Sequence, residues 1–384
     1  MLGGHVRTLG GNVACPALPP RVRLDAGVIE FGSDRFPTFR AFMKGLGVPI
    51  EEMPGAGATC LHLPEGKHYH SPDALRAEHG PGLELLRDGL HLCRLAVRRR
   101  RFLQAIGRAA PSVVCESAIE RYLRDDDFST WIRALLMYAY SMPYEEVRRL
   151  SAAIAIPMLR AFLAPVRWAR IPGGTSAYVD RVAQSLRRPP QLDARLRGVR
   201  RSAHGPHLIR EDGHEELFDV VVIAVPPHRV LSLLLDASDD ERAWFGAFEG
   251  GHVETLVHTD TALYEHRRLK WFSEFDLFEL PSGGHGYNAY LNRLAGLPTD
   301  RAPHYSLAFQ LDAEIDPAKI VHRQKHDVAR YTDEALRTRD DLARRNGARS
   351  TWFAGAFLGD GLHEGAIRSA AAIADRLGGR SLPS

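Results

Sequence analysis

The stretch that decides the fold is "STWFAGAFLGDGLHEGAIRSAAAIADRLGG", at residues 350–379. Its opening, "STWFAGAF", has the composition of a short apolar strand. Gly359 and Gly361 then permit a tight turn to which a ligand can come close. The helix predicted after this turn ends at Gly378 and carries one face at helical spacing: Ile367, Ala370, Ala371, Ala374 and Leu377.

This strand, turn and helix fit two interpretations. One is an ordinary unit of any α/β protein. The other is a nucleotide-cofactor site, because the free N–H groups and partial positive charge of a helix N-terminus stabilise a phosphate or the negative edge of a reduced flavin. The rest of the chain has to decide between them.

Two more regions have the pattern of strands that belong beside the closing one. "HLIREDGHEELFDVVVIAVPP" (207–227) predicts a hairpin about Asp212-Gly213 and then a Val/Ile strand buried on both faces. "RVRLDAGVIEFG" (21–32) alternates and is expected to be extended. Parallel-sheet strands are thus predicted near the start, near 220 and near 353, which indicates a discontinuous cofactor domain with a substrate domain inserted into it.

The intervening sequence is mostly helical at first and mixed later. A helix is predicted over 36–48, ending at Gly47, and helices fill most of 72–164, with Pro143 and Pro157 as interruptions. Strands are expected in "HVETLVHTD", "YNAYLNRL" and "YSLAFQL", and a charged helix over about 325–345.

Composition narrows the class of protein. The 384 residues are 45% hydrophobic and 25% charged, with a net charge of +3, which favours a globular enzyme and argues against a nucleic-acid partner. No apolar run reaches about 18 residues, so no transmembrane helix is expected, although peripheral membrane contact stays open. The four cysteines contain no C-x-x-C pair, which favours a reduced, cytoplasmic compartment and no metal site: Cys15, Cys60, Cys93 and Cys115.

Several other patterns have a structural interpretation that outweighs the functional one. His68 and His70 form an H-x-H pair without further ligands. The run Arg98–Arg101 is expected on a solvated helix face rather than in a lipid or nucleic-acid patch. His258 and Asp260 are too close in sequence to predict a relay. The apolar residues 151–166 are expected in the core, and no motif gives Lys270 a flavin-side role.

Four segments carry a resemblance to a known family. They are Gly3-Gly4-His5, "LDAGVIEFG", "RWARIPGGTSAYVDRVAQSL" and "WFAGAFLGDGLHEGAIRSA". Their order and spacing resemble those of the flavin-containing amine oxidoreductase superfamily, and within it a bacterial branch of predicted NAD/FAD-binding proteins. "FDVVVIAVPPHRVLSLL" and "TLVHTDTALYEHRRLKW" support the resemblance, as does "YLNRL", so it covers nearly the whole chain.

The resemblance implies an α/β fold with an incomplete FAD/NAD(P)-binding Rossmann-like domain and an inserted α+β substrate domain. The FAD domain is expected over 1–40, 165–230 and 345–384, and the substrate domain over 41–164 and 231–344. Implied cofactor-binding residues are Gly3, Gly4, His5, Asp25, Gly27, Val199, Ala224, Gly355, His363, Glu364, Gly365 and Ala366. Gly365 departs from the family pattern, which has Asp there.

The family's G-x-G-x-x-G fingerprint would precede Gly3, and the expectation is that this unit is missing and that FAD binding by this chain alone is weak. The implied activity is FAD-dependent oxidation of a C–H bond by hydride transfer to flavin, with a small-molecule substrate that is apolar or lipid-like. The alternative is a truncated, cofactor-free remnant or scaffold. Catalytic residues and oligomeric state are not predicted.

Overall fold

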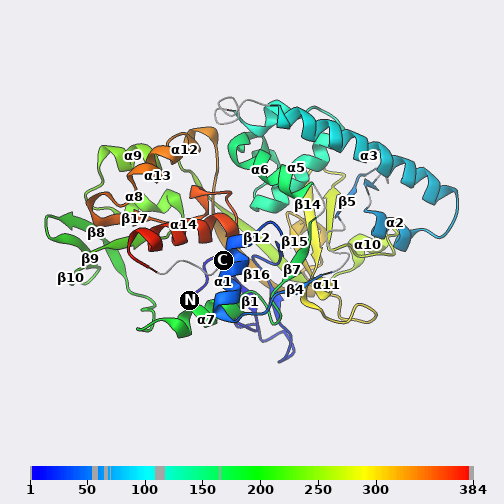
Figure 1. Cartoon of the computed structure of the whole chain (residues 1–384). Coiled ribbons are helices and arrows are strands. Elements are labelled where there is room, and N and C mark those ends of the chain that lie inside the picture. Colours follow the sequence, from blue (N-terminus) through cyan, green and yellow to red (C-terminus); the bar gives the residue numbers. More distant parts are fainter. Residues whose placement is uncertain are drawn as a thin grey trace.

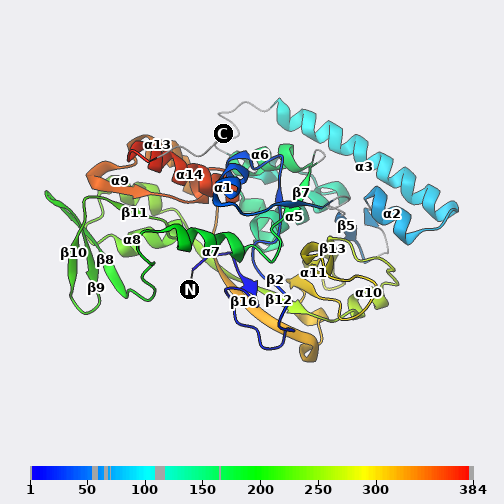
Figure 2. The same cartoon turned by 60° about the horizontal axis from the view of Figure 1, so that its bottom comes forward.

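The computed structural model describes residues 2–53, 59–64, 68–69, 71–108, 117–163 and 166–379. Figure 1 shows an elongated molecule whose two ends are built from different parts of the chain. The N-terminal segment and the C-terminal helix lie near one another between these ends, a placement that Figure 2 shows from a second direction. The seam between the ends is therefore where the first and last residues meet.

One end is built on a seven-stranded sheet with the order β16-β12-β15-β14-β13-β5-β6. All its strand pairs are antiparallel except β5 with β13, which is parallel. The strands are β5 (Thr59–His62), β6 (His68–Tyr69), β12 (Gly250–His258), β13 (Phe275–Glu279), β14 (His285–Tyr290), β15 (Ser306–Phe309) and β16 (Ile320–Ala329). The three strands predicted between 252 and 311 are confirmed, whereas the helix predicted from 325 begins only after β16.

Helices cover one face of this sheet, where Tyr138 packs on Phe275 at 4.2 Å between ring centroids. Pro143 precedes a short 3-10 turn, η2 (Tyr144–Arg149), as predicted. Pro157 does not interrupt its helix, because buried residues on both sides, Ile154 and Leu159, hold the helix in the core. The helices of this end are α2 (Pro72–Glu78), α3 (Leu83–Gly107), α5 (Asp127–Tyr140), α6 (Ala152–Phe162), α10 (Ala262–His266) and α11 (Leu291–Ala295), with the 3-10 turn η1 (Ile119–Tyr122).

The other end holds an antiparallel sheet of β8 (Leu196–Ser202), β9 (Gly205–Arg210) and β10 (Glu215–Leu217), and a parallel pair of β11 (Val221–Ile223) and β17 (Thr351–Phe353). The predicted hairpin is confirmed, with Gly213 at φ +85° in its turn. The prediction that β11 is buried on both faces is wrong, since Val222 is 45% exposed. The helices here are α8 (Val230–Leu233), α9 (Asp239–Phe245), α12 (Asp333–Arg337), α13 (Arg339–Arg345) and α14 (His363–Arg376).

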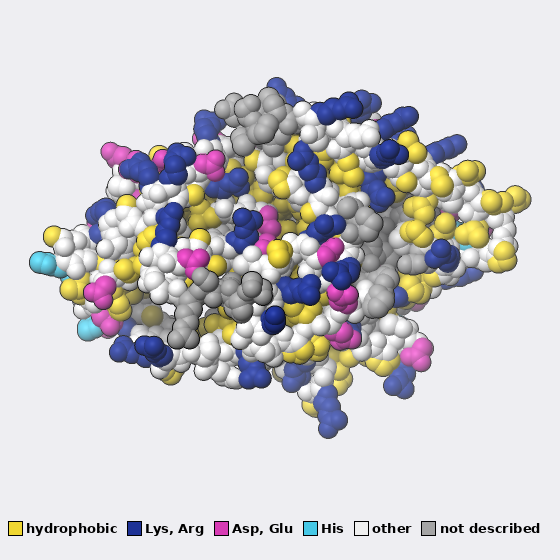
Figure 3. Space-filling model, in the orientation of Figure 1, with side chains coloured by type: hydrophobic (Ala, Val, Ile, Leu, Met, Phe, Trp, Pro, Cys, Tyr) yellow, Lys and Arg dark blue, Asp and Glu magenta, His cyan; other side chains and the backbone are white. Residues whose placement is uncertain are grey.

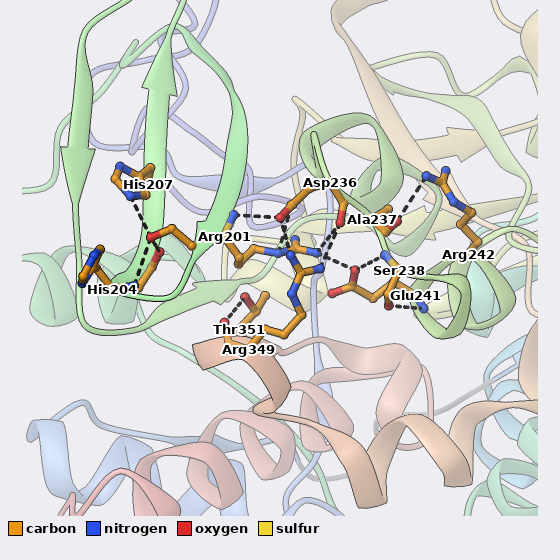
Figure 4. Close-up of polar contacts among 12 residues, drawn as sticks. Arg201, His204, His207, Asp236, Ala237, Ser238, Glu241, Arg242, Arg349 and Thr351 are labelled. Carbon is orange, nitrogen blue, oxygen red and sulfur yellow. Dashed lines mark hydrogen bonds and ion pairs between the residues drawn. The ribbon is translucent and has the colours of Figure 1, made fainter.

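A buried arginine joins three elements at this end. Arg201 of β8 binds Glu241 of α9 at 2.5 Å and Asp236 at 3.1 Å, as Figure 4 shows. Arg349, just before β17, also pairs with Asp236. Ser238 and Glu241 form a capping box that starts α9. The network fixes α9 against the strands, and Phe245 of α9 packs on Phe353 of β17 at 4.8 Å.

Short antiparallel pieces fill the seam: β1 (Thr8–Leu9) with β2 (Leu24–Asp25), and β7 (Trp168–Arg170) between β3 (Phe31–Gly32) and β4 (Glu51–Glu52). The prediction that residues 21–32 supply a parallel-sheet strand is therefore wrong, because β2 pairs with β1 and β3 with β7, both antiparallel. The helix predicted over 36–48 is confirmed as α1 (Pro37–Leu46), with Gly47 at φ +66° ending it. The segment "IPGGTSAYVDRVAQSL" leads into α7 (Ser176–Ser185).

The closing unit is confirmed as β17, a 3-10 turn η7 (Ala356–Leu358) and α14. The predicted inner face of α14 is wrong: Leu377 is 47% exposed, and the buried positions are Glu364, Gly365 and Ile373. The helix is oriented by its first turn, which lies against α1, and not by its alanines. The proposed domain boundaries stay a prediction. Among the described residues, no helix combines the length and the apolar character needed to cross a membrane.

Candidate functional site

The first and last parts of the chain are joined by one buried carboxylate. Helix α1 begins after Phe36, whose side chain makes no capping hydrogen bond. Glu364 of α14 supplies the missing acceptor: its two oxygens accept the backbone N–H groups of Thr38 at 3.0 Å and Phe39 at 2.9 Å. A negative group at a helix N-terminus is stabilised by the helix dipole. Glu364, predicted to contact a cofactor, is thus engaged in holding α14 on α1.

Asp25, the second predicted acidic residue, joins β2 to the start of α7. Its carboxylate accepts hydrogen bonds from the hydroxyl of Thr8, from the hydroxyl of Thr175 at 2.8 Å and from the N–H of Thr175 at 3.1 Å. Gly174 (φ +95°) lies so close that a Cβ there would collide with Thr8. The Pro-Gly-Gly segment and the Asp-x-Gly segment are therefore in contact.

A cavity of about 160 Å³ opens beside this junction. Asp25 and Gly173 line it together with three arginines, Arg21, Arg23 and Arg170. Arg170 is also paired with Glu51 at 2.9 Å. The cavity is thus positively charged, with one buried carboxyl in its wall.

Burial raises the pKa of Asp25 to about 6, against the hydrogen bonds from Thr8 and Thr175, which lower it. The folded chain then binds a proton that the unfolded chain releases above about pH 4, so stability is lost as pH rises from about 4 to about 6. Between about pH 4 and pH 6, we expect the free energy of unfolding of the wild type to fall by about 2–3 kcal/mol relative to that of Asp25→Asn. Urea unfolding at several pH values measures this, with Asp300→Asn as the exposed control; parallel pH curves for the wild type and Asp25→Asn would contradict it.

His5, Gly27 and His326 meet beside Asp25. The carbonyl oxygen of His5 occupies the space that a Cβ on Gly27 would need, which explains the glycine. The rings of His5 and His326 lie 6.1 Å apart, and His5 Nε2 lies 2.7 Å from the carbonyl oxygen of Asp327. His5, Asp25 and Gly27, three residues predicted to bind the cofactor, therefore lie next to one another and form one wall of the seam.

His363 brings the C-terminal helix to the same wall. Its Nε2 lies 3.0 Å from the hydroxyl of Tyr178 in α7, and its ring packs edge-on against Phe39 at 5.1 Å. Burial, followed by the nearby His5, lowers the pKa of His363 to about 4. A neutral imidazole and a tyrosine hydroxyl can exchange donor and acceptor roles, so the pair can hold a polar group of either kind.

At the start of α14, two backbone N–H groups are already bound by a side chain of the chain itself. Asp360 Oδ1 accepts the N–H groups of Leu362 at 2.8 Å and Gly365 at 2.9 Å. A Cβ on Gly365 would lie 2.5 Å from that same oxygen. The carboxylate of Asp360 thus fills the space that a side chain at position 365 would need. This explains why this chain has Gly at position 365, where the family pattern has Asp.

The remaining predicted positions lie at several places around the seam. Val199 is buried, and its carbonyl oxygen accepts the N–H of Leu235 at 2.9 Å, so this carbonyl is already used within the chain. Ala224 follows β11 and is exposed, and Gly355 follows β17, with its N–H donated to Ser369 at 3.0 Å. Ala366 lies in the first turn of α14, Gly3 (φ +112°) in a tight turn, and Gly4 (φ +56°) is exposed.

A buried carboxyl that sequence analysis missed lies deeper in the seam. Glu30 is 9% exposed; Tyr138 of α5 donates to its Oε1 at 3.3 Å, and its Oε2 has no hydrogen-bond partner among the described residues. Burial raises the pKa of Glu30 well above its usual value, and the neighbouring Glu274 raises it further. The signal was present in "VIEFG", where an acidic residue interrupts an apolar run.

The tyrosine that binds this carboxyl belongs to an aromatic cluster. Tyr138 packs on Phe275 at 4.2 Å and on Tyr287 at 5.3 Å, at the junction of α5 with the seven-stranded sheet. Glu274 lies 3.3 Å from Arg293 Nε. A buried carboxyl with a raised pKa, next to a second carboxyl, is the kind of perturbed group found at functional sites.

A separate buried cluster could hold a divalent metal. Ligand atoms of Cys60, His62 and Asp276 lie within 4.8 Å of one another, on the face of the sheet away from α5. The same groups are connected by hydrogen bonds: His62 with Asp276 at 2.9 Å and Cys60 with Ser273 at 3.2 Å. Tyr264 donates to Asp276 at 2.7 Å, and its hydroxyl also accepts from Asn288, which binds His258. The cluster is complete as a polar network without an ion.

Other sequence candidates are placed as follows. His258 lies within the network just described, and the N–H of Asp260 donates to its Nδ1 at 3.1 Å, a structural contact as predicted. Lys270 is exposed. His70 and the side chain of His68 lie outside the described residues. Residues 152–162 are largely core, as predicted.

Comparison with known proteins gives one family and several solved structures. The model of the family "flavin containing amine oxidoreductase" matches residues 95–253. Putrescine oxidase bound to putrescine superposes with a TM-score of 0.66 at 16% identity, over 99% of this chain and 92% of that chain. Cyclohexylamine oxidase from Brevibacterium oxydans IH-35A gives 0.67 at 13% identity, over 98% and 92%.

A third similar structure has a different activity. The fatty acid isomerase from P. acnes that produces CLA gives a TM-score of 0.65 at 14% identity, over 94% of this chain and 89% of that chain. No curated protein matches the chain in sequence. These identities are low, so the solved structures show the fold alone. The family-model match over residues 95–253 and the shared fold show that this chain is similar to the flavin-containing amine oxidoreductases.

Proposed function

We propose that the chain is an FAD-dependent oxidoreductase that oxidises a C–H bond of a small, apolar or lipid-like molecule by hydride transfer to the flavin. The observation that carries the proposal is a pair of contacts: the carbonyl oxygen of His5 lies against Gly27, and Tyr178 lies within hydrogen-bonding distance of His363, whose pKa the nearby His5 lowers. These contacts join four separate segments of the chain, as a cofactor shared between them requires. The bound flavin would supply the redox chemistry, and the chain would supply binding, orientation and electrostatics.

The residues at this wall fit a bound flavin in part. His363 and Tyr178 offer a neutral donor and acceptor pair, and the tight approaches at Gly27 and Gly174 hold the surrounding backbone in place. Asp25 and Glu364 are proposed to position this wall through α7 and α1, and not to contact the cofactor directly.

For the substrate, Glu30 with its aromatic neighbours is the proposed pocket. A carboxyl kept neutral by burial favours an apolar molecule and can donate or accept a proton. The second candidate is a protonated amine, which the adjacency of Glu30 and Glu274 and the rings of Tyr138 and Tyr287 favour, because carboxylates and aromatic faces attract cations. Among the described residues, Cys15 and Cys93 form no disulfide, which supports the proposed cytoplasmic location.

A cofactor-free protein of this fold is the alternative function. It is favoured by three groups that already occupy implied cofactor positions: the carboxylate of Asp360, the N–H of Leu235 and the carbonyl oxygen of His5. In this alternative, the converging segments serve only the packing of the two ends.

The visible spectrum of the purified full-length protein tests the proposal. We expect a flavin absorption band that survives gel filtration, or that is acquired after incubation with FAD. Exposing the loaded protein to an amine panel and a fatty-acid panel without oxygen then identifies the substrate class by bleaching of that band. A folded, monodisperse protein that stays colourless after incubation with FAD would overturn the proposal and leave the cofactor-free alternative.

A further inference from the structure

The outer face of α3 carries an apolar stripe that the rest of the molecule leaves uncovered. Leu83 is 84% exposed, Leu86 64%, Leu90 62% and Val97 50%, and Cys93 is exposed between them. The spacing of three and four residues puts all five side chains on one side of the helix. Exposed leucines are common singly, but a continuous helical stripe marks an interaction surface.

The opposite side of α3 fixes the helix to the protein. Leu95 and Ile106 are buried, and Phe102 packs on Phe128 of α5 at 5.5 Å. Figure 1 and Figure 2 both show α3 along the periphery of the molecule, away from the seam. The stripe therefore belongs to a helix whose orientation is set by its own core contacts and whose outer face is presented to the surroundings.

Arginines flank the stripe along its whole length. At 100° per residue, Arg87, Arg94, Arg98 and Arg101 follow one edge of it, and Arg100 lies on the other edge. Among the ion pairs of the described residues, none includes Arg94 or any residue of Arg98–Arg101. Figure 3 shows the hydrophobic side chains gathered at this end of the molecule, with dark blue side chains along the upper edge.

We propose that α3 is an interfacial helix that seats the protein on an anionic lipid surface. Leucines on one face with arginines at its edges match the hydrocarbon boundary and the anionic headgroups of a lipid leaflet. The long arginine stems can lie along the apolar zone while their guanidinium groups reach the headgroups. The sequence pattern alone favoured a solvated face for Arg98–Arg101; the exposed stripe beside it changes that interpretation.

A second copy of the chain fits the stripe less well. Packing two α3 helices face to face would bring their arginine edges together, while the acidic residues of α3, Glu84 and Asp88, lie on its inner side and pair with His79. Anionic lipid supplies the missing negative charge. The proposal does not depend on flavin binding, because the vesicle is the partner and no cofactor is involved.

Vesicle flotation of the full chain tests the proposal. We expect the protein to float with vesicles of phosphatidylcholine and 30% phosphatidylglycerol and to remain unbound with phosphatidylcholine alone. Leu86→Asp with Leu90→Asp should weaken binding at least tenfold, and Arg94→Glu with Arg98→Glu should weaken it similarly and remove its salt dependence. Because all four side chains lie on the outer face, thermal unfolding should be unchanged.

The matched control is Leu192→Asp with Leu235→Asp, two leucines of similar exposure away from α3, which should float as the wild type does. If Leu86→Asp with Leu90→Asp unfolds the protein, the variant Arg94→Glu with Arg98→Glu still tests the proposal. Equal flotation of wild type and both α3 variants, or no flotation of the wild type, would overturn the proposal. The proposal would also be overturned if light scattering showed a wild-type dimer that Leu86→Asp with Leu90→Asp converts to a monomer, because the stripe would then bind a second copy of the chain.

Discussion

Glu364→Ala is expected to lower the free energy of unfolding by about 4 kcal/mol. The substitution leaves the N–H groups of Thr38 and Phe39 without their acceptor in a buried place, and removes a negative charge from the start of α1. Phe36 offers no local replacement, because its side chain cannot accept a hydrogen bond. Urea or thermal unfolding of the two proteins measures the difference.

Two companion variants locate the cause. Glu364→Gln keeps one acceptor oxygen and should recover about half of the loss. Glu334→Ala, an exposed glutamate in the first turn of α12, should change stability by less than about 0.5 kcal/mol. If Glu364→Ala lowers the free energy of unfolding by less than about 0.5 kcal/mol, α1 and α14 are not joined through this carboxylate.

Glu30→Gln is expected to stabilise the protein above neutral pH and to abolish most of its activity. Burial raises the pKa of Glu30 above its usual 4.5, so the wild type loses stability as pH rises beyond that value, and the neutral amide does not. We expect a gain of about 2 kcal/mol at pH 8, typical of relieving a buried polar group. On the proposed function, flavin reduction by substrate should slow about a hundredfold, the usual contribution of a general acid or base.

Measuring the free energy of unfolding at several pH values tests the direction of this prediction. The stability difference between Glu30→Gln and wild type should be smallest near pH 4.5 and grow as pH rises. Glu216→Gln, on the exposed strand β10, should follow the wild type throughout. A variant that is less stable than wild type at pH 8 would show that Glu30 is ionised and held by a partner, and would remove the argument for a neutral carboxyl.

The sequence predicted local units well where the signal is local. The hairpin at Gly213, the end of α1 at Gly47 and the closing strand, turn and helix depend on neighbouring residues, and all three are confirmed. The inner face of α14 is a local failure, and the other main failures concern long-range partners. The parallel pairing of β5 with β13 joins residues more than 200 positions apart and leaves no periodic trace, so the seven-stranded sheet was seen only as separate strands.

The same distinction holds for the candidate site. The resemblance assigned Asp25 and residues of α14 to one cofactor site, but it did not predict the contact of Asp25 with Thr175 or of Glu364 with α1. What it did not reveal is how these groups are used. The N–H of Thr38, which donates to Glu364, lies 326 residues away, and Asp360 Oδ1 lies in the space beside Gly365. Glu30 was missed because burial, which is a property of the fold, gives it its character.

Hydrogen exchange with and without FAD tests the central claim most directly, which is that four separate segments form one flavin site. On binding, amides at residues 3–8, 24–30, 173–178 and 355–366 should slow together, while those of α3 should not change. Slowing of one segment alone, or no change anywhere at saturating FAD, would contradict the account.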